Sequence, residues 1–359
     1  MIDLHDRFCD EPFSFFFVGH RGFVYLCCPG RLVNQISIGN VFIEKDINLI
    51  WNSENAKLIR KSVCDGSFKY CNRYCPKITS DSLPRVENCN EQWLELVRNP
   101  MKDLNYQPPK IQFAYDNECN LRCVSCRHTI IRSNDFQIKK YDQVKDTILK
   151  PLLKNATTLI ISGSGDIFAS RHSVKYLEEL NSEEYPKLRY HILTNGILFN
   201  EKNWERYPNM QKMTRMLIIS VDAAKKETYE NVRRGGKWEV LLQNLNFAGK
   251  LRKSKKIEAL CIMFVVQKMN YQDMLEFIQL GYQIGADQIN FSRIENWGIY
   301  TDQEFIDFDV CDPRNTDHYK FLEVLKHPFF GSRRVSLGNL TEFRVSASLV
   351  NDDKISITP

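Results

Sequence analysis

Six short apolar segments alternate with stretches of helical periodicity across the middle of the chain, and this alternation constrains the fold more than any other feature. The helical stretches place apolar residues three and four positions apart. Strands that are joined by helices form a parallel sheet. Some strands, such as 216–221 (MLIISV), are apolar without alternation, which predicts burial on both faces. The predicted strands are 111–115, 158–162, 190–193, 216–221, 259–266 and 288–292, and the predicted helices are 143–154, 174–181, 238–251 and 271–284.

Six strand–helix units are too few for a closed eight-fold barrel, so we expect an α/β fold of the partial (β/α)6 TIM-barrel type. Residues 1–90 differ from this pattern, because they hold seven of the twelve cysteines and one predicted helix, at 48–61. Since so short a segment buries little core, a metal centre would stabilise it. We therefore predict a small cysteine-rich iron–sulfur domain at 1–90, a proline-containing linker at 91–109, the barrel at 110–310, and a tail at 311–359 with one helix at 318–327.

The composition excludes several classes of protein. Hydrophobic residues make up 43% of the chain and charged residues 26%, which is typical of a globular protein. The net charge of +5 is small for 359 residues, and the densest basic run, 250–256 (KLRKSKK), has no aromatic residues, so we predict no nucleic-acid partner. The longest apolar run, 259–266, is far shorter than the roughly 20 residues that span a bilayer. The N-terminus lacks a signal-peptide pattern, so we expect a cytoplasmic protein with no membrane partner.

Ten of the twelve cysteines gather in the N-terminal segment and in one loop. The cytosol keeps thiols reduced, so clustered cysteines there indicate a metal. Cys119, Cys123 and Cys126 form a C-x3-C-x2-C motif after the first predicted barrel strand. Three thiolates can hold three irons of a 4Fe–4S cube and leave the fourth iron open for a substrate or cofactor. The alternative is zinc, with His128 as its fourth ligand.

The C-x3-C-x2-C motif in this position resembles the radical S-adenosylmethionine (radical SAM) superfamily. Polar motifs follow the second, third and fourth predicted strands in the order of that family, at the strand ends where barrel enzymes build their sites. Gly163-Ser164-Gly165-Asp166 resembles the family's Gly-Gly-Glu-type motif, which holds the methionine amino group, and Ser220 and Arg233 match its carboxylate-binding Ser and Arg. The resemblance implies that S-adenosylmethionine is bound by Gly163, Ser164, Gly165, Asp166, Asn195, Ser220, Asp222 and Arg233, and the radical cluster by Cys119, Cys123 and Cys126.

The resemblance also implies the chemistry. Enzymes of this family reductively cleave S-adenosylmethionine to methionine and a 5′-deoxyadenosyl radical, which abstracts a hydrogen atom from the substrate. A one-electron donor such as flavodoxin or ferredoxin would be a partner. The cofactor carries the reaction, while the protein supplies positioning and excludes water.

The N-terminal cysteines form a second constellation. Cys27 and Cys28 end a predicted hairpin, GNV and IWN follow, and Cys71-x3-Cys75 closes the segment. This order resembles the SPASM/twitch domains of radical SAM enzymes, which carry auxiliary 4Fe–4S clusters and usually follow the barrel. The resemblance implies a second, auxiliary 4Fe–4S cluster held by Cys9, Cys27, Cys71 and Cys75.

The ligands and the metal of this second site stay open at the level of sequence. Adjacent cysteines point in different directions, so Cys28 could replace Cys27. A structural zinc ion would fit the same four thiolates. Cys64 and Cys89 are expected to be buried thiols, although a second auxiliary cluster would need them.

A closed, four-thiolate cube suits electron transfer, so we expect net oxidation of a small polar substrate that resembles a sugar or cyclitol. Arg293 and Glu295 follow the last predicted strand and are catalytic candidates that would manage the departing proton. The alternative is a radical SAM maturase that modifies a peptide or protein side chain, since many SPASM relatives act on peptides. A non-catalytic metal-binding protein is the third hypothesis, and it leaves the polar motifs at the strand ends unexplained.

Overall fold

The structure is a computed structural model and describes residues 3–344, so the first two residues of the predicted N-terminal domain and residues 345–359 of the predicted tail lie outside the described residues. The chain forms two compact units. The first contains the chain up to Asn120 together with Ile131–Thr194 and Lys202–Met216. The second contains Leu121–Ile130, Asn195–Glu201 and the chain from Leu217 onward.

The sheet of the first unit is made of β1 (Phe15–Val18), β2 (Phe23–Tyr25), β3 (Gly39–Asn40), β4 (Lys110–Phe113), β5 (Thr158–Ile161) and β6 (Arg189–Thr194), in the order β3–β2–β1–β4–β5–β6. Strands β4, β5 and β6 are parallel. Strand β1 is also parallel to β4, with Phe15 opposite Lys110. Strands β2 and β3 are antiparallel to their neighbours.

The mixed α/β fold with a parallel sheet is therefore confirmed, and β4, β5 and β6 lie where the apolar runs predict strands. A hairpin that ends at Cys27 and Cys28 is predicted without bounds for its strands, and β1 and β2 form it; β3 is not predicted. Strands β2 and β3 have only three and two residues, too few to show a period of two. Strand β1 has the sequence FFFV, in which aromatic residues hide the alternation.

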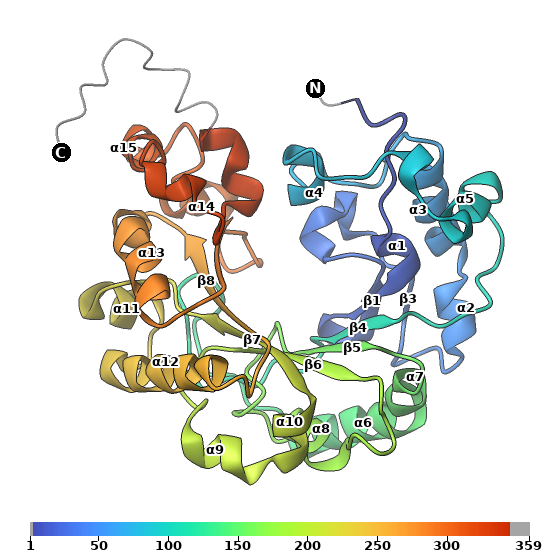
Figure 1. Cartoon of the computed structure of the whole chain (residues 1–359), viewed down its shortest axis with the longest axis horizontal. Coiled ribbons are helices and arrows are strands. Elements are labelled where there is room, and N and C mark those ends of the chain that lie inside the picture. The colour runs from blue at the N-terminus through green and yellow to red at the C-terminus, as the bar shows by residue number, and fades with distance from the viewer. Residues whose placement is uncertain (1–2, 345–359) are drawn as a thin grey trace. The chain divides into compact units, whose positions relative to one another are not determined.

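Helices of the first unit lie beside this sheet, and Figure 1 shows α6, α7 and α8 together along one side of β4, β5 and β6. The predicted helix at 48–61 is two helices, because Ser53 caps a new start by accepting a hydrogen bond from the Ala56 N–H. The predicted helix at 143–154 begins earlier, at a capping box formed by Asn134 and Gln137, and includes a π-helical turn at Lys145–Leu149. The helices are α1 (Glu11–Ser14), α2 (Ile47–Trp51), α3 (Glu54–Cys64), α4 (Pro76–Thr79), α5 (Glu91–Arg98, inside the predicted linker), α6 (Asp135–Val144), α7 (Lys150–Leu153), α8 (Val174–Glu179), α9 (Glu201–Arg206) and α10 (Pro208–Met213).

The second unit repeats the strand–helix alternation. Its elements are β7 (Thr214–Ser220, which begins in the first unit), α11 (Lys226–Val232), α12 (Trp238–Lys253), β8 (Ala259–Val266), α13 (Met274–Gln283), β9 (Gln288–Arg293), α14 (Asp302–Phe308), α15 (His318–Leu325) and β10 (Val335–Ser336). Strands β8, β9 and β10 are parallel. Helix α13 packs closely on β9 at Gly281, where the lack of a side chain permits the approach: a Cβ there would lie 2.5 Å from Cδ1 of Ile289. The predicted tail therefore contributes a strand, β10, which is too short to be recognised from sequence.

Burial along the strands corrects one expectation. Leu159, Ile161, Leu217 and Ile219 are buried, but alternate residues such as Ile160 are only half-buried. The prediction that these strands are buried on both faces is therefore wrong: one face is fully covered and the other only in part. Within 3–344, none of the helices is long and apolar enough to cross a membrane.

Candidate cofactor-binding sites

Glu118 immediately precedes Cys119, and its carboxylate is completely buried. The two carboxylate oxygens accept hydrogen bonds from the backbone N–H groups of Ser133 and Arg171, each at 2.8 Å. Its carbonyl oxygen accepts a further one from the N–H of Asp166 at 2.9 Å. Hydrogen bonds to an ionised carboxylate are among the stronger ones in proteins. Glu118 therefore fixes the segment that leads to Cys119 against two other loops of the first unit.

Gly165 of the predicted Gly-Ser-Gly-Asp motif packs directly against that segment. A Cβ at Gly165 would lie 2.3 Å from the carbonyl oxygen of Glu118, so only glycine fits. The next residue, Asp166, is 1% exposed, and its carboxylate accepts hydrogen bonds from the Thr194 hydroxyl at 2.7 Å and the Phe168 N–H at 3.0 Å. The motif thus connects the end of β5 to the end of β6, through Thr194, and to Glu118, which precedes Cys119.

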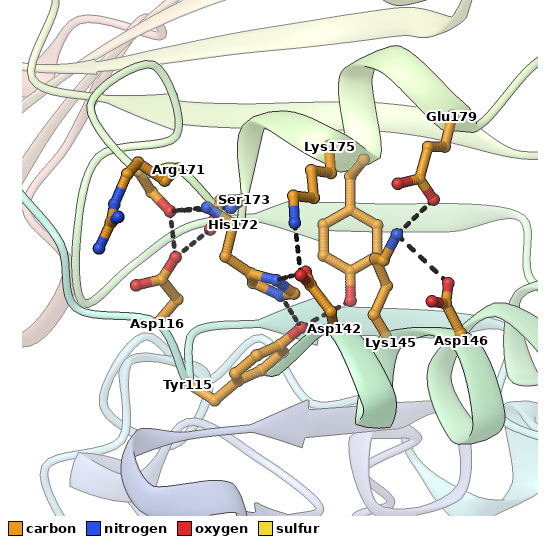
Figure 2. A network of polar contacts seen from close by, with 12 residues as sticks. Tyr115, Asp116, Asp142, Lys145, Asp146, Arg171, His172, Ser173, Lys175 and Glu179 are labelled. Atoms are coloured by element: carbon orange, nitrogen blue, oxygen red, sulfur yellow. Dashed lines mark hydrogen bonds and ion pairs between the residues drawn. The ribbon is translucent and has the colours of Figure 1, made fainter. Parts of the chain in front are cut away.

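A buried polar network supports the chain just after β4 (Figure 2). The Tyr115 hydroxyl lies 2.6 Å from Nε2 of His172 and 2.6 Å from the Tyr176 hydroxyl, and Nδ1 of His172 lies 2.8 Å from Oδ1 of Asp142. Burial lowers the pKa of His172 and so favours a neutral ring. Because a carboxylate only accepts hydrogen bonds, Nδ1 carries the ring proton and Nε2 accepts from Tyr115.

Asp116 extends the network one residue further toward Cys119. Its Oδ2 accepts hydrogen bonds from the hydroxyls of Ser173, at 2.8 Å, and Ser170. Residues 115, 116 and 118 are thus all held by buried polar contacts. No sequence motif marks this network, because the residues that form it come from separate elements of the fold.

In the second unit, Arg233 lies beside Cys123 and Asp222, and two of these three are predicted cofactor contacts. Nη2 of Arg233 is 2.6 Å from Oδ2 of Asp222, and Nη1 is 3.6 Å from Sγ of Cys123. Although burial opposes it, Asp222 and Cys123 raise the pKa of Arg233. Asp222 is 1% exposed and also accepts a hydrogen bond from the Val265 N–H at 2.8 Å. Arg233 and the Val265 N–H therefore both contact the Asp222 carboxylate, which holds Arg233 beside Cys123.

Cys126 also has an arginine beside it. Nε and Nη2 of Arg127 lie 3.3 and 3.2 Å from its sulfur. His128, the candidate fourth ligand of the zinc alternative, is exposed and lies 3.3 Å from the carbonyl oxygen of Ile299. Cys119 belongs to the first unit, whereas Cys123 and Cys126 belong to the second.

Asn195 begins a turn that a missed residue, Asn244, holds in place. Oδ1 of Asn195 accepts a hydrogen bond from the Ile197 N–H at 3.0 Å, and Gly196 has a positive φ of 80°. Nδ2 of the buried Asn244 on α12 donates to the carbonyls of Gly196 and Ile197 at 2.8 and 2.9 Å. The sequence did contain a signal for Asn244, because it is a polar residue on an otherwise apolar face of a predicted helix. Ser220 lies half-buried at the end of β7.

Arg293 lies at the end of β9 and is paired with Asp309. Its Nε is 2.8 Å from Oδ2 of Asp309, and its N–H donates to Oδ1 of Asn339 at 2.9 Å. Although burial opposes it, Asp309 raises the pKa of Arg293, so this side chain stays protonated. Glu295 is half-buried. Of the two catalytic candidates, only Glu295 is a chemical type that can accept a proton.

The four predicted auxiliary ligands line one cavity in the first unit. Cys9, Cys27, Cys71 and Cys75 border it, and among the described residues Cys28 does not. Backbone contacts bring two of the cysteine segments together: Leu32 forms a β-bridge with Cys71, and the Asn72 N–H donates to the Arg31 carbonyl at 2.8 Å. Of the two adjacent cysteines that spacing alone cannot separate, Cys27 therefore borders the cavity together with the other three predicted ligands.

The donor set of this cavity is soft, and thiolates are the ligands that iron–sulfur clusters use. Burial raises the pKa of Cys9 to about 11 and that of Cys71 to about 12, so the apo thiols carry protons that metal binding would release. Within 3–344, no three His, Cys, Asp or Glu side chains are arranged to hold one metal ion, so the four thiols border a space rather than meet at a point. Outside the cavity, the sulfurs of Cys64 and Cys89 donate to the carbonyls of Leu96 and Arg85.

Two family models match the chain. Residues 117–281 match the radical SAM superfamily, and residues 9–77 match the SPASM iron–sulfur cluster-binding domain. The chain carries a radical SAM domain preceded by a SPASM domain. The radical SAM match includes the whole C-x3-C-x2-C motif, and the SPASM match includes the four cysteines of the cavity. The predicted N-terminal position of the SPASM domain is confirmed.

Several solved structures are similar to the chain at low sequence identity. SuiB of Streptococcus suis bound to S-adenosylmethionine is 14% identical over 82% of this chain and 64% of that chain, with a TM-score of 0.45. Native anSMEcpe with bound AdoMet is 19% identical over 64% of this chain and 62% of that chain, with a TM-score of 0.41. TYW1 with a lysine–pyruvate adduct is 20% identical over 62% of this chain and 72% of that chain, with a TM-score of 0.37. The chain spans less than two thirds of anSMEcpe and of SuiB in its S-adenosylmethionine-bound structure, and no curated protein matches it.

The close approach of Gly165 to Glu118 generates the first prediction. Gly165→Ala must displace the backbone before Cys119, at a cost of about 1–3 kcal/mol in the free energy of unfolding. We expect less iron in the radical SAM domain and weaker binding of S-adenosylmethionine, measured by iron analysis and by calorimetry. Gly285→Ala is the control for the loss of a glycine as such, because a Cβ there would meet nothing within 4 Å, although the φ of 73° at Gly285 adds backbone strain that Gly165 does not have. Full iron content and unchanged affinity in Gly165→Ala would contradict the packing argument.

The buried network generates a prediction on pH. The pKa of His172 is lower in the folded protein than in the unfolded chain, so its contribution to stability is present above about pH 6.5 and is lost as the pH falls. The free energy of unfolding should decline from pH 7 to pH 5 by up to roughly 1.4 kcal/mol per pH unit from this group. His172→Gln should be less stable at pH 7 but show a flatter pH dependence in urea unfolding. The exposed His5→Gln should keep the wild-type slope, and an unchanged slope in His172→Gln would refute the assignment.

Proposed function

We propose that the chain is a radical SAM enzyme in which Cys119, Cys123 and Cys126 hold the radical cluster and S-adenosylmethionine binds beside it. When bound, the cluster supplies the electron that cleaves S-adenosylmethionine to a 5′-deoxyadenosyl radical. The observation that carries this proposal is the family match over the cysteine motif. It is supported by the arginines beside two of these cysteines: Nη1 of Arg233 lies 3.6 Å from the sulfur of Cys123, and Nε of Arg127 lies 3.3 Å from that of Cys126.

The chain's own residues bind and position the cofactor. Arg233 is a buried cation that suits the methionine carboxylate, together with Ser220. Because the Asp222 carboxylate is engaged by Arg233 and Val265, we assign it the role of positioning Arg233. Asp166 is likewise engaged by Thr194. We therefore assign contacts to the methionine amino group to the backbone carbonyls of the Gly163-Ser164-Gly165 turn, of which that of Gly165 also accepts a hydrogen bond from the Ser162 hydroxyl at 2.7 Å. Asn195 completes the set.

For the substrate we favour a peptide or protein side chain over a small sugar- or cyclitol-like molecule. The SPASM match supports this choice, since many SPASM relatives act on peptides. The small-molecule hypothesis drew on Arg293, and the ion pair with Asp309 takes that side chain out of the set of free polar groups. Glu295 remains the candidate proton acceptor for a net oxidation. Transfer of deuterium from labelled peptides, or from labelled polyols, into 5′-deoxyadenosine separates the two hypotheses.

We propose that Cys9, Cys27, Cys71 and Cys75 hold an auxiliary 4Fe–4S cluster. A cube with four thiolates has no open iron, so it suits one-electron transfer from the substrate radical. The radical cluster needs an external one-electron donor, such as flavodoxin or ferredoxin. Net oxidation is therefore the reaction type that the two sites together would serve.

The radical cluster is tested by single substitutions of its ligands. Cys119→Ala, Cys123→Ala or Cys126→Ala leaves two thiolates, too few to hold the cube with one open iron. We expect each variant to fold and to form no 5′-deoxyadenosine after anaerobic reconstitution and reduction, measured by chromatography. Cys261→Ala, a buried cysteine on β8, is the matched control and should retain cleavage. Wild-type rates in any one of the three ligand variants would exclude that cysteine from the site.

The auxiliary site is isolated by removing the first one. In a Cys119/Cys123/Cys126 triple-alanine variant, about four irons and four sulfides per chain should remain. Adding Cys27→Ala should abolish them, whereas adding Cys28→Ala should not, because only Cys27 lines the cavity. Zinc without sulfide in the triple variant would show a structural zinc site instead.

A further inference from the structure

The cavity of the four cysteines also contains charged side chains that no part of the proposed function uses. Two are cations, Arg31 and Lys77, and one is the carboxylate of Glu11. The Lys77 ammonium lies 3.1 Å from Oδ1 of Asp10 and 3.2 Å from Oε1 of Glu11. Its positive charge is therefore largely matched by two carboxylates of the same segment.

Arg31 differs from Lys77 in its surroundings. Within 3–344 the structure gives its guanidinium no carboxylate within ion-pair distance and no hydrogen-bond acceptor, although the side chain is half-buried. The backbone of Arg31 is fixed on both sides: its N–H donates to the Cys28 carbonyl at 2.9 Å, and its carbonyl accepts from the Asn72 N–H at 2.8 Å. The residue thus lies between the segment of Cys27 and the segment of Cys71 and Cys75.

The electrostatics of the site follow from this placement. Although burial opposes it, the thiols of Cys27, Cys28 and Cys75, when ionised, raise the pKa of Arg31, and the Glu11 carboxylate, which is not in ion-pair contact with Arg31, adds a smaller effect in the same direction. Four thiolates around an iron–sulfur cube give an anionic complex, and reduction adds one more negative charge. A half-buried cation is screened by solvent less than a surface one. Net charge, hydrogen bonds to sulfur and solvent exposure are the factors that set the potential of such a cluster.

We propose that Arg31 raises the reduction potential of the auxiliary cluster by placing a positive charge that is in no ion pair, with its N–H donors, at the wall of the four-cysteine cavity. This inference rests on the proposed auxiliary cluster. The step concerned is a one-electron reduction of the cluster, in which no bond forms or breaks and no proton moves. A higher potential makes the cluster a better acceptor for an electron from a substrate radical, so Arg31 is a positioning residue for charge and touches no substrate.

The test measures the midpoint potential of the auxiliary cluster by EPR-monitored titration with dithionite. It uses the full-length triple-alanine variant of Cys119, Cys123 and Cys126, which leaves a single cluster to observe. Arg31→Gln and Arg31→Met remove the charge, and we expect both to shift the midpoint to more negative potential. Arg31→Lys keeps the charge and should stay close to the parent protein.

Arg73→Gln is the matched control. Arg73 lies in sequence between Cys71 and Cys75, but it is exposed, its guanidinium is 4.6 Å from the ring centroid of Tyr74, and it does not line the cavity. The same change of charge at this position should leave the potential unchanged.

Three results would overturn the inference. One is an unchanged potential in a fully loaded Arg31→Gln or Arg31→Met. Another is an equal shift in Arg31→Lys, which would show that side-chain shape, not charge, matters. The third is loss of the cluster in both neutral variants but not in Arg31→Lys, which would assign Arg31 to cluster assembly. Zinc without sulfide in the parent triple variant is a separate result, since it refutes the auxiliary cluster itself.

Discussion

The buried carboxylate of Glu118 accepts the hydrogen bonds on which the position of the segment before Cys119 depends. A carboxylate with no exposed surface is stable only when its oxygens are hydrogen-bonded, and here two backbone N–H groups from different loops fulfil that need. Removal of either N–H would leave one buried oxygen without its hydrogen bond, although Nε of Arg171 also lies 3.6 Å from Oε1. The loops at Ser133 and Arg171 are therefore as much part of the cysteine loop's support as the residues beside Cys119 in sequence.

The tight contact at Gly165 adds a second constraint of a different kind. A hydrogen bond tolerates small displacements, but a backbone oxygen 2.3 Å from where a Cβ would stand tolerates no side chain at all. The motif therefore has two distinct duties: glycine permits the approach of two chain segments, and Asp166 then joins β5 to β6 through Thr194. Both duties concern the packing of the segment that precedes Cys119.

The sequence was most informative where a signal is long or chemically specific. Long apolar runs such as 259–266 predict β8 to the residue, and the cysteine spacing identifies both metal-binding segments. Strands β3 and β10 have only two residues each, too few to show alternation, so the sequence does not predict them. The sequence could name Asp222 and Arg293 as polar residues at strand ends but could not show that each is engaged in an ion pair, because the partners are set by the fold. The choice between Cys27 and Cys28 likewise needed the cavity.

The parallel pairing of β1 with β4 has a consequence for biosynthesis. Strand β1 lies between Cys9 and Cys27, and its ladder partner is Lys110–Phe113, so the N-terminal cysteine segment completes its hydrogen bonds only when the chain beyond residue 113 has left the ribosome. Contacts between residues so distant in sequence form late, since a long loop must close first. The segment that is synthesised first therefore lacks its partner strand until the chain reaches Phe113. In this chain the order of translation is not the order in which the N-terminal segment completes its sheet.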